Sequence, residues 1–203
     1  MIQQATLKPA VVWVGALGGL SSGAALIVSI IGGWPLSISV VFIVFPGLVT
    51  LAAISASLRR EQQALFLSRL RVGLLAGALA TAGYDGIRLL LEQLGLVPGH
   101  SFLAIPLFGT GLTGHPPTDL VAVVAGWAFH VTNGLGFAVA YTLVMAGRSW
   151  FFALAFALFL EVMMVSLYPG WLRVPLTKEF LSLTVAGHFV YGTTLGLIVR
   201  RAR

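Results

Sequence analysis

The amino-acid sequence predicts an all-helical integral membrane protein, a bundle of six transmembrane helices arranged as three helical hairpins. Of its 203 residues, 58% are hydrophobic and only 9% are charged, whereas a soluble domain carries about a quarter charged residues. A soluble protein needs polar groups over its surface, but the hydrocarbon of a bilayer surrounds an apolar exterior without penalty. The composition therefore predicts a multi-pass protein of the cell membrane, a bacterial inner membrane or its equivalent, with lipid as its main partner.

Six stretches reach the roughly 20 apolar residues that a transmembrane helix needs. They cover residues 10–32, 35–58, 70–96, 120–145, 150–171 and 180–199. Pro46 and Gly47 fall inside the second stretch, where a proline is expected to kink the helix. The longest connection, 97–119, has an apolar middle. This middle predicts either a re-entrant segment buried in protein or a loop on the lipid headgroups.

Basic residues mark one end of the predicted helices. With the N-terminus inside, the inner segments hold nine of them and the outer segments hold only Arg173 and Lys178. The nine are Lys8, Arg59, Arg60, Arg69, Arg71, Arg148, Arg200, Arg201 and Arg203. Because cytoplasmic segments of membrane proteins are rich in Lys and Arg, both termini are predicted to be cytoplasmic. Basic residues at the ends of apolar runs, rather than on one solvated face, argue against nucleic acid as a partner.

Four ionisable residues lie at similar depth in four of the predicted helices. Each of them is about 8–11 residues from the outer end of its helix, which at 1.5 Å per residue places it near the bilayer midplane. They are Asp85, His130, Glu161 and His188. Ionisable groups inside a membrane are costly, so the pattern predicts an interior polar site that opens toward the outside.

Further polar residues share helix faces with these four. Arg88 is one helical turn from Asp85, which predicts an orienting pair. Asn133 and Tyr141 share a face with His130, and Tyr191 shares one with His188. The fourth and sixth predicted helices also share a short match, His-x-x-x-Gly, which starts at His130 and at His188. Two glycine-rich helices can match in this way by chance.

The leading functional prediction is a bound metal ion, in a membrane metalloenzyme or on a path for ions. Two imidazoles and a carboxylate form a common ligand set for Fe, Zn or Mn. The predicted ligands are His130, Glu161 and His188, with a surrounding shell of Asp85, Arg88, Asn133, Tyr141 and Tyr191. The sequence contains no His-Glu-x-x-His motif, so the ligand set rests on depth alone.

Three other interpretations stay open. The first is haem b held by His130 and His188, or an accessory subunit of a larger membrane complex. The second is a proton-coupled small transporter, alone or as a homo-oligomer, in which carboxylates and imidazoles relay protons. The third is purely structural, with Asp85 and Arg88 neutralising each other. Thiolate metal sites and disulfides are excluded, because the chain has no cysteine.

Overall fold

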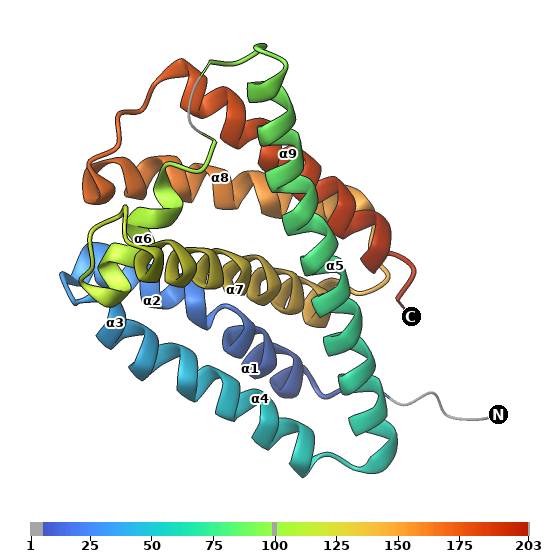
Figure 1. Ribbon diagram of the computed structural model, residues 1–203. Coiled ribbons are helices and arrows are strands. Elements are labelled where there is room, and N and C mark those ends of the chain that lie inside the picture. Colours follow the sequence, from blue (N-terminus) through green and yellow to red (C-terminus); the bar gives the residue numbers. More distant parts are fainter. Residues whose placement is uncertain (1–5, 99–100, 203) are drawn as a thin grey trace.

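The protein is all-helical over the residues that the structure, a computed structural model, describes, which are 6–98 and 101–202. This confirms the predicted helical class (Figure 1). The elements in chain order are α1 (Pro9–Gly19), α2 (Ser21–Gly32), α3 (Leu36–Ser39), the π-helical turn η1 (Val40–Val44), α4 (Phe45–Ser57), α5 (Arg60–Gln93), α6 (Ala104–Thr113), α7 (Leu120–Met145), α8 (Trp150–Leu172) and α9 (Lys178–Val199).

Five helices in the described ranges are long and apolar enough to cross a membrane. These are the continuous helix from α3 through α4, together with α5, α7, α8 and α9. The pair α1 and α2 makes a sixth if it counts as one span, but the two are bent by 56°. The stretch 10–32, predicted as one helix, is therefore broken at Leu20. Glycines precede this break and serines follow it, which is the composition at which helices bend.

The helix that contains Pro46 is distorted before the proline rather than at it. The proline ring displaces the carbonyl four residues earlier, that of Phe42. Phe42 lies inside η1, whose wider π-helical turn gives the ring room. Residues 36–57 consequently remain one helix.

The start of α5 differs from the sequence-based expectation, and the connection 97–119 contains a helix. Helix α5 begins at Arg60 rather than at residue 70, because the Arg-, Gln- and Leu-rich stretch before residue 70 favours helix. Arg69 and Arg71 therefore lie on a helix and not in a connection. The segment 97–119 contains the short helix α6, whose Ile105 and Phe108 are buried.

Helices α6 and α7 touch backbone to backbone. A Cβ atom added at Gly109 would collide with the backbone of Ala122, and one added at Gly126 would collide with that of Ile105. Only glycine allows this approach. The apolar middle of the segment is thus packed against α7 as part of the bundle.

The connections gather at two opposite ends of the bundle (Figure 1). At one end, the side chain of Gln62 donates to the carbonyl of Thr6 at 3.2 Å. At the same end, the N–H of Gly147 donates to the carbonyl of Val199 at 3.3 Å. Both ends of the described chain therefore lie on the side of the α4–α5 and α7–α8 connections, to the right in Figure 1.

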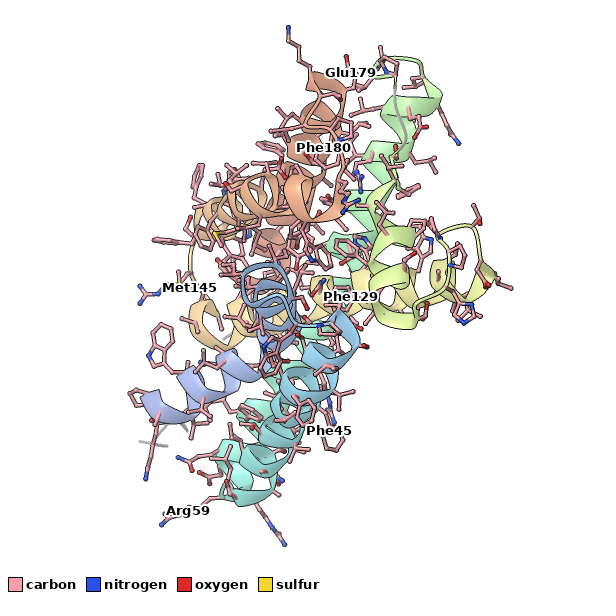
Figure 2. The ribbon with its side chains drawn as sticks, turned by 90° about the vertical axis from the view of Figure 1, so that its left-hand side faces the viewer. Phe45, Arg59, Phe129, Met145, Glu179 and Phe180 are labelled. Carbon is pink, nitrogen blue, oxygen red and sulfur yellow. The ribbon has the colours of Figure 1, made fainter. Side chains whose placement is uncertain are left out.

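The opposite end holds the starts of α7 and α9. Asp119 caps α7 by accepting the N–H of Val121 at 2.8 Å, and Thr177 caps α9 by accepting that of Phe180 at 3.1 Å. These interactions satisfy helix-end donors that would otherwise lack partners. The Val121 N–H and the side chain of His115 keep the pKa of the Asp119 carboxyl below its usual range. Figure 2 shows Arg59 and Glu179 at opposite ends of the molecule.

The contact between α6 and α7 can be tested with one methyl group. We expect Gly126→Ala to lower the free energy of unfolding by about 1–3 kcal/mol, because the added carbon overpacks the contact. The matched control is Gly86→Ala in α5, where an added Cβ meets nothing within 4 Å; this change should be neutral or slightly stabilising. Thermal unfolding in detergent measures both, and wild-type stability of Gly126→Ala would contradict the packing.

Candidate functional site

The four ionisable residues predicted at one level form two separate pairs. Nε2 of His130 lies 3.0 Å from both carboxylate oxygens of Asp85, which joins α7 to α5. Nδ1 of His188 lies 2.7 Å from Oε2 of Glu161, which joins α9 to α8. The four side chains are between 6% and 18% exposed. The bundle interior therefore contains two imidazole–carboxylate pairs rather than one cluster of four.

In the hairpin of α5 and α7, a glycine lets the helices approach beside the pair. Gly134 follows His130 by four residues, and Thr81 precedes Asp85 by four. A Cβ added at Gly134 would collide with the hydroxyl of Thr81. The two helices thus meet one turn away from the Asp85–His130 pair, which fixes their register.

The hairpin of α8 and α9 repeats this arrangement at the same spacing. Gly192 follows His188 by four residues, and Ala157 precedes Glu161 by four. A Cβ added at Gly192 would lie 2.7 Å from the Cβ of Ala157. The short His-x-x-x-Gly match in the sequence is thus part of a structural repeat of two hairpins.

The two pairs differ in one positive charge: among the described residues, the Asp85–His130 pair has an arginine beside it, and the Glu161–His188 pair does not. Arg88 follows Asp85 by three residues, and its Nη1 lies 3.9 Å from Oδ1 of that carboxylate. Met164 occupies the equivalent position after Glu161. Within the described part of the chain, His188 is the one basic side chain in an ion pair with Glu161.

Hydrogen bonds from neighbouring groups hold the side chains of Glu161 and Arg88 in place. The hydroxyl of Thr184 donates to Oε1 of Glu161 at 2.8 Å. The buried guanidinium of Arg88 donates to the carbonyl of Ser101, and the Ser101 hydroxyl donates to the carbonyl of Arg88 at 3.0 Å. Ser101, which precedes α6, is therefore tied to the C-terminal part of α5.

Tyr84 connects the two pairs, and the sequence analysis missed it. Its ring centroid lies 5.9 Å from that of His130 and 4.9 Å from that of His188. The guanidinium of Arg88 lies 4.9 Å from the same ring. Tyr84 precedes Arg88 by four residues, and that helical spacing was the available signal.

The structure places the three remaining predicted residues differently from one another. The hydroxyl of Tyr191 donates to the carbonyl of Gly134 at 2.6 Å and so ties α9 to α7. Asn133 lines a cavity that His130 and His188 also line. Tyr141 packs against Phe156, with ring centroids 5.6 Å apart, three turns along α7 from His130 and away from both pairs.

A cavity of about 410 Å³ lies between α1, α2, α5, α6, α7, α8 and α9. It opens to the outside of the bundle, where the exposed side chains of Leu17 and Phe159 line it. Its polar wall comprises Thr81, Tyr84, Arg88, His130, Asn133, Thr184, His188 and Tyr191. Most of the remaining lining is apolar and includes Leu20, Ile27, Phe137, Phe159 and Met163. Both imidazoles line the cavity, whereas their carboxylates stand behind them.

The predicted metal centre is not assembled in this arrangement. No group of three or more His, Asp or Glu side chains converges on a common point within residues 6–98 and 101–202. The ring of Tyr84 contacts both imidazoles, so a metal or a haem b between His130 and His188 would require that ring to move. Both cofactors stay predictions from the sequence.

The tie between α9 and α7 gives a matched pair of substitutions. Tyr191→Phe should lower the free energy of unfolding by about 1 kcal/mol, because it removes a buried hydrogen bond. Tyr141→Phe is the control: both tyrosines are 5% exposed, but in the described structure only Tyr191 uses its hydroxyl. Denaturation in detergent compares the two, and equal effects would show that the bond to Gly134 contributes nothing.

The contacts of the two imidazoles define what the site can do chemically. Hydrogen bonds with the described residues engage one ring nitrogen of each imidazole. The second nitrogen can therefore accept a proton from a molecule in the cavity or donate one to it, while the carboxylate stabilises the imidazolium. No family model, curated protein or solved structure matches this chain.

Proposed function

We propose that this protein crosses the cell membrane six times and binds a largely apolar small molecule in its interior cavity as a proton-coupled carrier. The observation that carries the proposal is the cavity, an apolar chamber of about 410 Å³ with one protonatable wall. Binding sites for small molecules are usually apolar cavities of about 300–1,000 Å³ with a few convergent polar groups.

The outer surface supports a membrane location. Large apolar side chains point away from the bundle, with Ile31 71%, Phe42 68% and Phe45 66% exposed. Lipid would cover them, whereas an apolar surface this extensive is unusual on a soluble monomer. Most described basic residues lie beside the helix ends on the side that holds both chain ends, which supports cytoplasmic termini. They are Lys8 before α1, Arg59 and Arg60 between α4 and α5, Arg148 after α7, and Arg200 and Arg201 after α9. Figure 2 shows Arg59 at this end.

Polar groups without partners support a ligand in the cavity. Oγ1 of Thr81, Nε of Arg88 and Oδ1 of Asn133 are buried and have no hydrogen-bond partner among the described residues. All three side chains line the cavity. Because buried polar atoms are normally hydrogen-bonded, a ligand or cavity water is expected to satisfy them.

The proposed topology can be tested with single cysteines, since the native chain has none. His115→Cys lies at the proposed outer end, and Ser149→Cys lies at the proposed inner end. Both native side chains are exposed. We expect a membrane-impermeant maleimide to label His115→Cys in intact cells but to label Ser149→Cys only after permeabilisation. The cysteine-free parent is the control, and labelling of both variants in intact cells would contradict an odd number of crossings between them.

The proposed cavity can be tested by filling it. Ala24 lines the cavity, so Ala24→Trp should abolish binding there. In lipid nanodiscs, a photoreactive medium-chain alkyl alcohol should label the cavity residue Met163 in the wild type and not in Ala24→Trp. Labelling of Phe45 on the exposed face should be equal in both. The matched control, Ala53→Trp on the exposed face of α4, should leave both labels unchanged. No label at Met163 in the wild type would refute the cavity proposal.

A further inference from the structure

The charges around the cavity do not balance when both imidazoles are neutral. Asp85 and Glu161 contribute two negative charges, and Arg88 contributes one positive charge. One negative charge is then left in an apolar interior. A charge without compensation in such surroundings is strongly unfavourable.

The excess negative charge belongs to the hairpin of α8 and α9. Arg88 contacts Asp85, whereas Met164 stands at the matching position beside Glu161. Other titratable groups near the His188–Glu161 pair are Tyr84, Asp85 and Arg88 from α5, His130 from α7, Tyr168 from α8 and Tyr191 from α9. The tyrosine hydroxyls are uncharged. Arg88 and His130 both contact Asp85, in the other pair. Compensation at Glu161 must therefore come from a proton or from the ligand.

We propose that the ligand of the cavity is an amphipathic organic cation that exchanges for one proton at the His188–Glu161 pair. This inference rests on the proposed function and names its substrate class. With the cavity empty, the proton on His188 balances Glu161. With the cation bound, the ligand supplies the positive charge, and His188 releases its proton to water. No bond other than the N–H bond changes, and the charge of the interior stays constant.

The cavity lining suits an organic cation. Aromatic rings line the space, among them those of Phe137, Phe156, Phe159 and Tyr168. Aromatic faces attract cations within about 6 Å, most strongly where water is excluded. Arg88 also lines the cavity, but Asp85 balances its charge, its guanidinium donates to the carbonyl of Ser101, and the rings of Tyr84 and Phe102 lie 4.9 and 5.5 Å from it. Its Nε–H is left for a cavity water.

A series of probes with similar shape and different charge tests the inference on the full chain in nanodiscs. The probes are tetraphenylphosphonium, the neutral triphenylphosphine oxide and the anion tetraphenylborate. We expect the cation to bind at least tenfold more tightly than either other probe. Where the pair carries its proton, the Kd of the cation should rise about tenfold for each pH unit of acidification, because one proton is released per cation bound. Calorimetry in two buffers with different ionisation enthalpies counts that proton.

Two variants separate the roles of the pair. Glu161→Gln removes the excess charge, so the preference for the cation and the pH dependence should both disappear. His188→Gln keeps the charge of Glu161 but removes the proton carrier, so the preference should remain while the pH dependence over the neutral range is lost. The control is Glu179→Gln, which removes a partly exposed carboxylate in the first turn of α9, outside the cavity lining, and should change neither property. Unfolding temperatures establish that each variant folds. If Glu161→Gln does not fold, the loss of pH dependence in His188→Gln alone tests the proposal.

Equal affinity for the neutral probe, absence of proton release, or no binding of any probe would each overturn the assignment of a cation. The cavity proposal would survive those results if Met163 is still labelled in the wild type and protected in Ala24→Trp. Failure of that labelling would remove both proposals together.

Discussion

The cost of placing charge in an apolar interior governs this fold. Each carboxylate stands directly against an imidazole on the neighbouring helix, Asp85 against His130 and Glu161 against His188. Such contacts need helices that approach closely at a fixed register, and a glycine one turn away allows that approach in both hairpins. These contacts hold α5 against α7 and α8 against α9, and the Tyr191 hydroxyl ties the two hairpins together. The cavity lies between the hairpins, and α2 and α6 contribute to its lining.

Helices that local sequence determines could be predicted, whereas breaks and helices that depend on packing against distant residues could not. Apolar runs predicted the long helices, because their length and hydropathy are local properties. The break at Leu20 was not predictable, since it depends on the neighbouring Gly19, whose Cβ position is occupied by the backbone of α7. The helix α6 was only an apolar stretch in the sequence, because ten residues acquire a stable helical form by packing against a partner.

The site was predictable in depth but not in partnership. Counting residues along each helix placed Asp85, His130, Glu161 and His188 at one level, and the structure brings all four into the interior. Counting residues cannot give the rotation of one helix relative to another. The division into two pairs separated by Tyr84 was therefore not foreseen. Tyr141 was placed in the site for a different reason. It shares a helix face with His130, but a shared face does not imply a shared level along the helix axis.

The repeat of two hairpins also has a symmetry. Helices α7 and α9 both start at the end where Asp119 and Thr177 cap them, so the hairpins run in the same direction. Their relating axis therefore runs along the helices and not across them. Transporters built from repeats alternate access largely by rocking or gating one repeat against the other around a fixed site. In the proposed carrier, access would consequently alternate by rotation of α8 and α9 against the other helices, with the cavity along the seam between them.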